Sequence, residues 1–521
     1  MLSEQASAPS IRQENSNKYD AIIIGSGFGG LGAAIKLKEA GIDSFVVLER
    51  GSDLGGTWRD NDYPGCACDV QSHLYCFSFE PNPSWSRLFA PQNEILAYLR
   101  HCADRYDVRR FIRFGECVVR AEYDDARAEW TVRTSAGAVY RGKVLISAMG
   151  ALSNPAYPDI PGLERFEGRA FHSALWDHDY DLRGKRVAVI GTGASAIQFV
   201  PRIAQQVGEL HLYQRTAPWV FPKPDRPTTE RQRKLFARFS FLLFLYRTLI
   251  YWTLEARALA FFHPWLMKRL EKLAKRYIAS QISDSELRRK VTPDYTMGCK
   301  RILMADDYYP ALARPNVNVL TEPVREVRRR GVVTADGTER EVDAIVFGTG
   351  FTVQNLVPRG MLLGSNGRDI VDAWRDGIEA YKGTTVAGFP NLFLIAGPNT
   401  GLGHTSMVFM IESQIAYVVD ALRRMRTGGW ASVDVRPETQ TAYNATLQRK
   451  HTGAVWSSGC RSWYLDGRGR NTTLWPGFTF VFRRQTARFD ERAYVIRKAV
   501  SFEADVSERA ASGRRTVEST T

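Results

Sequence analysis

Cysteine is scarce in this sequence, and no cysteine lies at a spacing that would bind a metal ion or form a redox-active pair. Seven cysteines are spread over 521 residues. Cys66 and Cys68 are separated by a single residue, and no second pair of cysteines or histidines accompanies them at zinc-ligand spacing. We therefore predict no metal site and reduced thiols, as is usual in cytoplasmic proteins.

Hydrophobic runs long enough to cross a membrane are absent too. The densest apolar run, residues 239–254, is shorter than the roughly twenty residues that a spanning helix needs, and Arg247 lies near its centre. The first 17 residues contain Glu4 and Glu14 and lack the apolar core of a signal peptide. We expect residues 1–17 and 503–521 to be disordered tails, and the protein to be cytoplasmic.

Acidic residues are fewer than basic ones, but the basic excess is scattered. The 70 lysines and arginines against 56 aspartates and glutamates give a net charge of +14. The chain has no long lysine tract and no basic segment interleaved with aromatic residues, which argues against nucleic-acid binding. With 44% apolar residues, a chain of this length can bury large cores, so we expect two domains with insertions.

A glycine-rich loop follows the first predicted strand. Residues 19–24 are apolar and β-branched, and a helical pattern and a second strand at residues 44–48 come after the loop. The glycines at the motif positions of the loop are Gly25, Gly27 and Gly30. Such glycines let the backbone approach a pyrophosphate, and Glu49 at the end of the second strand can accept hydrogen bonds from ribose hydroxyls. This unit predicts an FAD site.

The same pattern occurs a second time, with a different residue at its end. Strands predicted at residues 186–190 and 209–213 flank a loop and a helix. The loop positions are Gly191, Gly193, Ser195 and Ala196. Arg215 stands where the first unit has a carboxylate, and a guanidinium binds a 2′-phosphate that a carboxylate would repel. We predict an NADPH site, the alternative being that Arg215 is an ordinary surface arginine.

The two units together predict an α/β protein with two Rossmann-like dinucleotide-binding domains. Strands near residues 143–149 and 342–347 indicate that the chain leaves the FAD-binding domain and later returns to it, so that the NADPH-binding domain is inserted and the FAD-binding domain is discontinuous. The predicted boundaries are 18–152 and 342–502 for the FAD-binding domain with a C-terminal lid, 153–228 and 291–341 for the NADPH-binding domain, and 229–290 for a helical insertion.

The helical insertion combines the aromatic and leucine-rich run with a basic helical pattern at residues 268–277. We expect it to be buried against the NADPH-binding domain or a subunit partner. Contact with the surface of a membrane is the less favoured alternative.

Two further motifs narrow the chemistry. Residues 55–69, GGTWRDNDYPGCACD, match the pattern GGxWxxxxYPGxxxD. Residues 166–177 match FxGxxxHxxxW followed by Asp, just ahead of the second glycine loop. Together the two motifs resemble those of Baeyer-Villiger monooxygenases, a group of flavin monooxygenases, and the similarity extends from Tyr19 to about Phe482.

The resemblance implies an enzyme that uses FAD, NADPH and dioxygen to convert a ketone to an ester or lactone through a C4a-peroxyflavin, with sulfides as further substrates. It places Arg301 at the flavin and Lys300 beside Arg215 at the 2′-phosphate of NADPH. A fixed guanidinium stabilises the anionic oxygen adduct and the oxyanion formed from the ketone, and Asp69 would orient Arg301 through a charge-assisted pair. NADP+ is expected to stay bound and to protect the adduct.

His172, in the second motif, is one of only eight histidines and is expected at the junction of the two domains. We favour a positioning or gating role for it over acid-base chemistry. A predicted turn at residues 397–401 follows an apolar strand and can point backbone amides at the flavin ring. The predicted catalytic residues are Arg301, Asp69 and His172, and the predicted cofactor-binding residues are Gly25, Gly27, Gly30, Glu49, Gly56, Trp58, Asp69, Tyr75, Gly191, Gly193, Ser195, Arg215, Lys300 and Asn399.

The chain departs from the family pattern in two places. Residues 456–464, WSSGCRSWY, stand where cyclic-ketone enzymes have a loop rich in Asn-Ile-Pro-Gly-Lys, and they resemble the branch that acts on aryl and open-chain ketones. Ala196 replaces the third glycine of the second loop, a change common with NADPH.

Three other activities stay open. Oxygenation of sulfides or amines without ketone activity needs less from Arg301. A disulfide or quinone reductase shares the two dinucleotide folds, although no CxxC pair lies near either loop. A non-enzymatic, redox-responsive flavoprotein is the most distant alternative.

Overall fold

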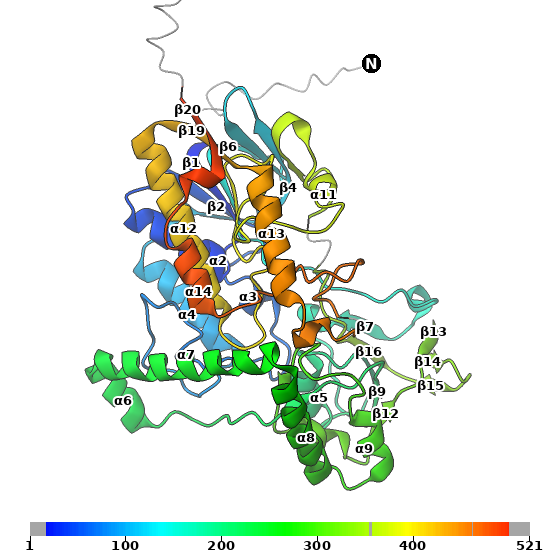
Figure 1. Cartoon of the computed structure of the whole chain (residues 1–521). Coiled ribbons are helices and arrows are strands. Elements are labelled where there is room, and N and C mark those ends of the chain that lie inside the picture. The colour runs from blue at the N-terminus through cyan, green and yellow to red at the C-terminus, as the bar shows by residue number, and fades with distance from the viewer. Residues whose placement is uncertain (1–16, 354–356, 461, 500–521) are drawn as a thin grey trace, which may run out of the picture.

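The computed structural model describes residues 17–353, 357–460 and 462–499, so the predicted tails, apart from Asn17, lie outside it. Two sheets with parallel strands form two lobes, an upper and a lower one in Figure 1. Each lobe carries one of the two glycine loops at the carboxyl end of a strand. This arrangement is the predicted α/β fold with two Rossmann-like units.

The larger sheet contains eight strands and carries the first glycine loop. Its order is β17-β4-β5-β6-β1-β2-β3, and β18 also pairs with β6. The neighbours of β1 and β2 are parallel, whereas β4-β5 and β5-β6 are antiparallel. The bounds are β1 (Lys18–Ile24), β2 (Phe45–Glu49), β3 (Ile112–Phe114), β4 (Val118–Asp124), β5 (Glu129–Thr134), β6 (Val139–Ser147), β17 (Leu362–Leu363) and β18 (Leu392–Leu394).

Helix α2 (Phe28–Glu39) lies between the larger sheet and α12 (Met407–Gly428). Its apolar and small residues are buried nearly all round, as expected for a helix with a sheet on one side and a helix on the other. Gly32 lies at the contact, where a Cβ would come within 2.8 Å of Ile415. This close approach fixes the start of α2, and with it the first glycine loop, against the core.

The smaller sheet contains five parallel strands in the order β12-β9-β8-β16-β7 and carries the second glycine loop. The bounds are β7 (Arg169–His172), β8 (Arg186–Ile190), β9 (Glu209–Tyr213), β12 (Val317–Leu320) and β16 (Ala344–Phe347). The predicted boundary at residue 342 is therefore wrong: β16 does not begin the second part of the first domain, because it is hydrogen-bonded between β8 and β7. The chain returns to the larger sheet only at β17.

Three small sheets and the remaining helices complete the fold. The small sheets pair β10 (Val220–Phe221) with β11 (Leu303–Met304), β13 (Val324–Arg328) with β14 (Gly331–Thr334) and β15 (Glu339–Glu341), and β19 (Trp430–Val435) with β20 (Tyr494–Lys498). The other α-helices are α3 (Thr57–Asp60), α4 (Gln92–Arg105), α5 (Ala196–Ile203), α9 (Ser285–Val291), α10 (Tyr308–Leu312), α11 (Ile370–Ala373), α13 (Pro437–His451) and α14 (Thr479–Thr486). Short 3-10 helices are η1 (Arg109–Phe111), η2 (Leu163–Arg165), η3 (Ser173–Leu175), η4 (Ser365–Gly367), η5 (Val455–Ser457) and η6 (Glu491–Ala493).

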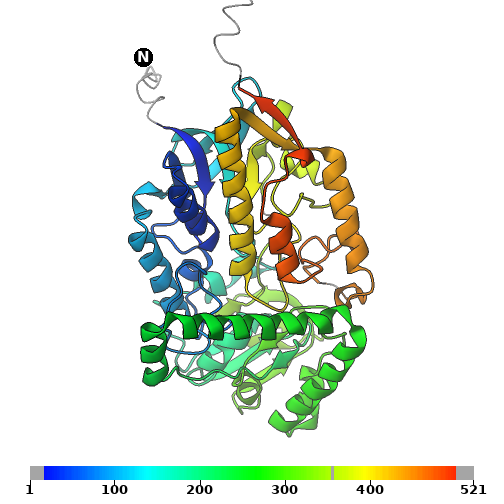
Figure 2. The same ribbon diagram turned by 60° about the vertical axis from the view of Figure 1, so that its left-hand side comes forward.

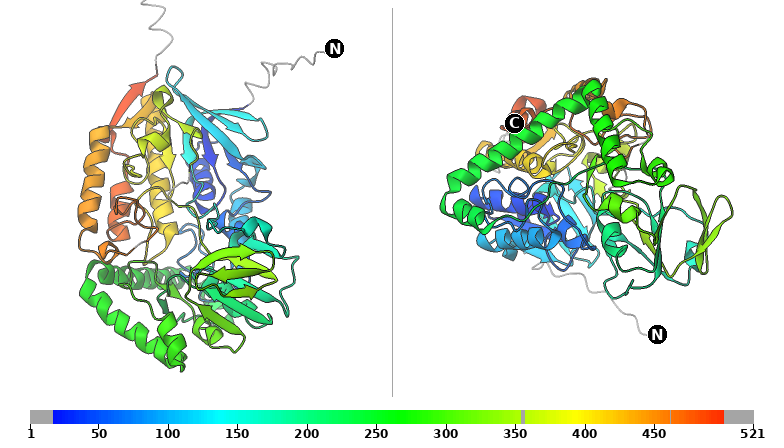
Figure 3. Two further views of the ribbon diagram at one scale, coloured as in Figure 1. Left: turned by 90° about the vertical axis from the view of Figure 1, so that its right-hand side faces the viewer. Right: turned by 90° about the horizontal axis from the view of Figure 1, so that it is seen from below.

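The predicted helical insertion, residues 229–290, forms α6 (Glu230–Arg238), α7 (Ser240–Phe262), α8 (Pro264–Gln281) and most of α9. Helix α7 runs along the base of the upper lobe, and α6 and α8 turn away from its two ends (Figures 2 and 3). No single helix in the described parts of the chain is long and apolar enough to span a membrane. Helices α6 and α7 meet the requirement for length and composition only as a pair, and they are joined at a bend of 112°.

Helix α7 packs on the upper lobe, whereas α8 contacts α10 and β10 of the lower lobe, so only part of the insertion is buried against the predicted NADPH-binding domain. Ile250 and Leu254 form an apolar cluster with Leu74. Arg247 turns toward the same side and donates a hydrogen bond of 2.8 Å to the carbonyl of His73. These residues recur at three- and four-residue spacing, so only one face of α7 is covered.

Candidate active site

The first glycine loop has the geometry of a phosphate cradle. Gly25 has φ +94°, and a Cβ on Gly30 would lie 1.8 Å from the carbonyl oxygen of Gly25. Gly27 faces Gly56 of the 55–69 motif, where a Cβ would come within 3.7 Å of the Gly56 Cα. Helix α2 starts at Gly27 without a side-chain cap. The loop therefore presents bare backbone and free helix N–H groups, which fit the pyrophosphate of a dinucleotide such as FAD.

Glu49 lies at the end of β2, as predicted, but its carboxylate is already hydrogen-bonded. Oε2 accepts from the backbone N–H and the hydroxyl of Ser26 at 2.9 and 2.7 Å, and Oε1 accepts from the N–H of Gly51 at 2.8 Å and from Arg59 at 2.7 Å. Burial alone would raise the pKa of Glu49, but these donors outweigh it and hold the pKa below its usual value. A ribose hydroxyl would have to replace one of them.

The 55–69 motif connects the two lobes. Its Trp58 is buried and donates a hydrogen bond of 3.2 Å to the hydroxyl of Tyr75. Tyr63 donates to the side-chain oxygen of Gln198 on α5 at 2.9 Å, and Gln198 returns a bond of 3.0 Å to the carbonyl of Ala67. The motif is thus packed against the first helix of the second nucleotide unit, a contact that the sequence pattern did not reveal.

The second glycine loop repeats the construction of the first. Gly191 has φ +105°, and a Cβ there would lie 2.5 Å from the carbonyl oxygen of Gly348. A Cβ on Gly193 would meet only that same oxygen, at 3.7 Å. Helix α5 begins after Ser195, whose side chain makes no capping hydrogen bond. The loop therefore fits a second dinucleotide phosphate.

Two cations lie beside this loop. Arg215 follows β9 and is exposed, and Lys300 is half-buried with its Nζ 4.7 Å from the centre of the Tyr295 ring. Burial, and next the charge of Arg215, lower the pKa of Lys300. The structure thus brings together the two residues that the sequence assigned to one phosphate.

Asp69 and Arg301 form an ion pair although 232 residues separate them. The Nε and Nη2 of Arg301 donate to Oδ2 of Asp69 at 3.1 and 2.5 Å, and Nη1 donates to the carbonyl of Leu402 at 3.3 Å. The charge of Asp69 raises the pKa of Arg301, and Arg301 in turn overcomes the effect of burial and lowers the pKa of Asp69. Both groups are therefore held in their charged forms.

Tyr464 is a site residue that the sequence analysis did not assign. It is 2% exposed, and burial raises its pKa to about 12 against the opposing charge of Arg301. The phenol thus stays protonated at neutral pH beside the ion pair. Residues 456–464 depart from the family pattern in sequence, and only the path of the chain places their last residue next to Arg301.

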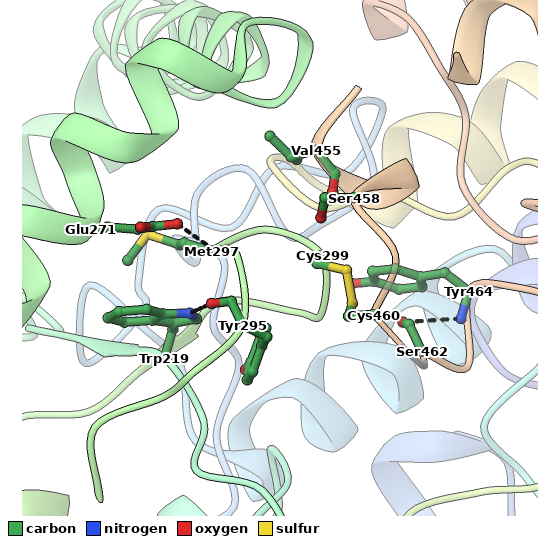
Figure 4. Close-up of a disulfide and its surroundings, with 10 residues drawn as sticks. All are labelled: Trp219, Glu271, Tyr295, Met297, Cys299, Val455, Ser458, Cys460, Ser462 and Tyr464. Carbon is green, nitrogen blue, oxygen red and sulfur yellow. Dashed lines mark hydrogen bonds between the residues drawn. A yellow bond between two sulfur atoms is a disulfide. The ribbon is translucent and has the colours of Figure 1, made fainter. Parts of the chain in front are cut away.

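A disulfide between Cys299 and Cys460 corrects the prediction that all thiols are reduced. The two Cα atoms are 6.3 Å apart, and the bond lies next to Tyr464 (Figure 4). Sequence reasoning missed the pair because 161 residues separate the two cysteines and neither is part of a spacing motif. The bond ties the segment that carries Lys300 and Arg301 to the C-terminal loop.

His172 lies where two connections between the lobes cross. It is fully buried, its Nδ1 accepts a hydrogen bond of 3.1 Å from the N–H of Ala174, and its ring contacts those of Tyr157 and Phe351. Tyr157 belongs to the connection into the smaller sheet, and Phe351 to the connection out of it. Burial lowers the pKa of His172, so the ring is neutral at neutral pH.

Asn399 is in the predicted turn, with φ +54°, but its side-chain amide is used within the protein. The amide donates to the carbonyls of Asn471 and Leu474 at 2.7 and 3.0 Å. It joins the turn to the C-terminal loop. Across the described residues, no group of three or more His, Cys, Asp or Glu side chains is arranged to hold a metal ion.

Comparisons with known proteins agree with this geometry. A model of the flavin-binding monooxygenase-like family matches residues 18–357. A Baeyer-Villiger monooxygenase of Pseudomonas aeruginosa is 56% identical over 475 residues, which cover 91% of this chain and 90% of that protein. The structure of cyclohexanone monooxygenase from Rhodococcus sp. Phi1 bound to NADP+ superposes with a TM-score of 0.84 at 29% identity, covering 93% of this chain and all of that one (100%). The complex of OTEMO with FAD and NADP gives a TM-score of 0.83 at 27% identity over 92% of this chain and 99% of that one.

Proposed function

Because the chain belongs to the flavin-binding monooxygenase-like family and, within it, to the Baeyer-Villiger monooxygenases, we propose that it uses NADPH and dioxygen to convert a ketone to an ester or lactone, with Arg301 as the residue that stabilises negative charge on oxygen. The ion pair between Arg301 and Asp69 is the observation that carries the proposal. When bound, FAD that NADPH has reduced supplies the electrons that turn dioxygen into a nucleophile toward the ketone carbon.

The two cofactors are assigned to the two loops. Gly25, Gly27 and Gly30, with Gly56 behind them, would hold the pyrophosphate of FAD, and Trp58 and Tyr75 would support the motif that carries Asp69. Gly191, Gly193 and Ser195 would hold the pyrophosphate of NADPH, and Arg215 and Lys300 its 2′-phosphate.

Arg301 has donors to spare for the reaction. A guanidinium carries five N–H groups, and three of them point at Asp69 and Leu402. Tyr464 also forms a hydrogen bond with the guanidinium, so an oxyanion on the ketone oxygen would share the remaining two N–H groups with this phenol. Asp69 keeps the guanidinium charged and fixes its plane, so that little reorganisation is needed when the negative charge develops.

The remaining groups have supporting roles. Tyr464 keeps its proton, and its phenol oxygen accepts a hydrogen bond from Arg301. His172 is a positioning residue at the crossing between the lobes, because its ring is neutral and surrounded by protein. Hydride transfer requires the two nucleotide domains to be correctly placed, and His172 would keep the crossing connections in register.

Replacement of Arg301 by alanine tests the proposal. We expect ester formation to fall by roughly 10²- to 10³-fold, the usual cost of losing one oxyanion donor. Reduction of the bound flavin by NADPH, followed at its visible absorption band, should persist. Asp69→Asn keeps an oxygen acceptor but removes the charge, and should give a smaller loss.

Arg186→Ala is the matched control, because it breaks an ion pair with Asp343 of 3.1 Å at the amino end of the smaller sheet. Ester formation by Arg301→Ala at the wild-type rate, or equal losses in Arg301→Ala and Arg186→Ala, would contradict the assignment. Loss of ketone oxidation with unchanged sulfide oxidation would confine the role of Arg301 to the ketone reaction.

A cytoplasmic location is part of the proposal and is supported by four free cysteines that are buried, Cys66, Cys68, Cys76 and Cys102, and one that is exposed, Cys117. The bond between Cys299 and Cys460 is unusual for a reducing compartment, so its state in the cell tests this part of the proposal. Trapping of thiols in intact cells, followed by mass analysis of the peptides around Cys460, reports which state the protein has where it works.

A further inference from the structure

Exposed apolar side chains gather on the helical insertion. The described residues include 17 large hydrophobic side chains that are exposed, and ten of them lie between Leu235 and Leu273, on or between α6, α7 and α8. Single exposed apolar residues are common on soluble proteins, but so many on one insertion indicate a surface that contacts something else.

Helix α7 has two apolar faces, of which the protein covers only one. The outer face carries Phe241, Phe244, Leu245, Leu249 and Trp252, and Phe241, Phe244 and Leu249 are each 62–65% exposed. Their spacing of three and four residues forms one stripe along the helix. The charged side chain within this stretch, Arg247, turns inward to the carbonyl of His73. The stripe is therefore apolar along its length and is open to solvent.

The flanks of the stripe are strongly basic. Residues 230–281 contain eleven arginines and lysines and three glutamates. Glu255 is buried in contact with His404, and Glu230 is paired with Lys234. The exposed cations lie on α6 before the stripe and, after it, at Arg257 on α7 and on α8. On α8, Arg269 lies 5.0 Å from the ring of the exposed Trp265.

We propose that this face of α6, α7 and α8 docks on an anionic lipid surface, with the α7 stripe inserted at the level of the headgroups and the basic flanks on the lipid phosphates. An apolar helical stripe with tryptophan and phenylalanine, bordered by lysine and arginine, is the pattern of a helix that lies in a membrane interface. The bend of 112° between α6 and α7 agrees with a helix that lies on the bilayer and does not cross it. The proposal does not depend on the reaction that the enzyme catalyses.

The positive charge of this face favours an anionic lipid surface over a second copy of the chain as its partner. Two copies that met through this face would bring two basic surfaces together, which is unfavourable. An anionic bilayer attracts each of the cations that lie near its surface. The complementary partner is therefore a negatively charged one with an apolar interior, as a phospholipid bilayer is.

Flotation of the FAD-loaded enzyme with vesicles tests the proposal. Vesicles of phosphatidylcholine alone are compared with vesicles that also contain phosphatidylglycerol, each at low and at high salt. We expect at least about tenfold more protein on the anionic vesicles at low salt, and less at high salt because salt screens the flanking charges. The double variant Phe244→Ser/Leu249→Ser should lower this partition about tenfold or more, since each side chain buries its apolar surface on docking.

Val119→Ser/Val495→Ser is the matched control, because these two valines are 49% and 47% exposed on strands of the upper lobe. It should partition like the wild type. Bound flavin and far-ultraviolet circular dichroism establish that each variant is folded. If Phe244→Ser/Leu249→Ser does not fold, the charge variant Lys272→Glu/Lys275→Glu is used in its place and should likewise lower the partition onto anionic vesicles.

Absence of the wild type from anionic vesicles at low salt would overturn the proposal. So would equal partition of the stripe variant and the wild type. Sedimentation of the wild type as a dimer that Phe244→Ser/Leu249→Ser converts to a monomer would assign the face to a second copy instead, and would likewise overturn it.

Discussion

The two glycine loops have the same backbone construction but differ at the position that selects the nucleotide. Gly25 packs on the carbonyl of Ala148 after β6, and Gly191 packs on the carbonyl of Gly348 after β16. At the end of the next strand the first unit has Glu49 and the second has the exposed Arg215. Equal loops followed by opposite charges fit our proposal that the fold provides the phosphate site and that one side chain selects the ribose or its 2′-phosphate.

The loops also differ at their third position, where the first has Gly30 and the second has Ala196. A Cβ on Gly30 would lie 1.8 Å from a backbone oxygen of its own loop. Ala196 is tolerated because the turn opposite it has Gly348, where a Cβ would lie 3.1 Å from the Ala196 methyl group. Both helix starts are therefore close-packed. The first loop has no room for a methyl group at its third position, whereas the second loop has that room because the residue opposite Ala196 is a glycine.

Among the substitutions that test this comparison, Gly30→Ala should have the largest effect, and the effect is on FAD binding by the first loop. The added methyl group overlaps the Gly25 carbonyl, so the first loop cannot keep its shape, and we expect the purified protein to contain little or no FAD. Absorbance at the flavin band relative to the protein band measures the loss. The reverse change at the equivalent position, Ala196→Gly, is the control and should keep FAD. Normal flavin content in Gly30→Ala would show that the loop is more adaptable than its packing indicates.

Arg215→Glu should shift the nucleotide preference of the second loop from NADPH toward NADH. Loss of a charged hydrogen bond to the 2′-phosphate, and repulsion in its place, should raise the KM for NADPH by roughly 10- to 100-fold and leave the KM for NADH nearly unchanged. Steady-state rates with each nucleotide measure the ratio. Arg202→Glu, which removes an exposed arginine paired with Asp307 at 3.2 Å, is the control for a change of net charge. Parallel changes for both nucleotides would contradict a 2′-phosphate contact.

The lowered pKa of Lys300 predicts a smaller effect, in which the KM for NADPH depends on pH. Because burial and Arg215 lower the pKa of Lys300, the side chain loses its charge at a lower pH than an ordinary lysine. The positive form binds the 2′-phosphate, so the ratio of KM for NADPH to KM for NADH should rise as the pH increases through that pKa. A bound phosphate favours the charged form and should reduce the shift. Lys300→Arg stays charged and should show a flat ratio over the same pH range, and an unchanged slope in that variant would exclude Lys300 as the source.

Local motifs predicted most of the fold. The strands at residues 186–190 and 209–213 have the predicted bounds, and both glycine loops lie between a strand and a helix. These features depend on backbone preferences and apolar periodicity within about thirty residues, and a sequence displays them directly. The strand β16 was assigned to the wrong domain because a single buried strand has the same apolar pattern in either sheet.

What the sequence alone determined about this protein is the pair of nucleotide loops, the charge that follows each of them and the two motifs that indicate its family. What only the tertiary structure decided are the contacts between distant segments: the pairing of Asp69 with Arg301, the position of Tyr464, the bond between Cys299 and Cys460, and the open outer face of α7. The physical reason is that loop and capping geometry is set by neighbouring residues, whereas the meeting of groups 161 or 232 residues apart depends on how both sheets and the insertion pack as a whole.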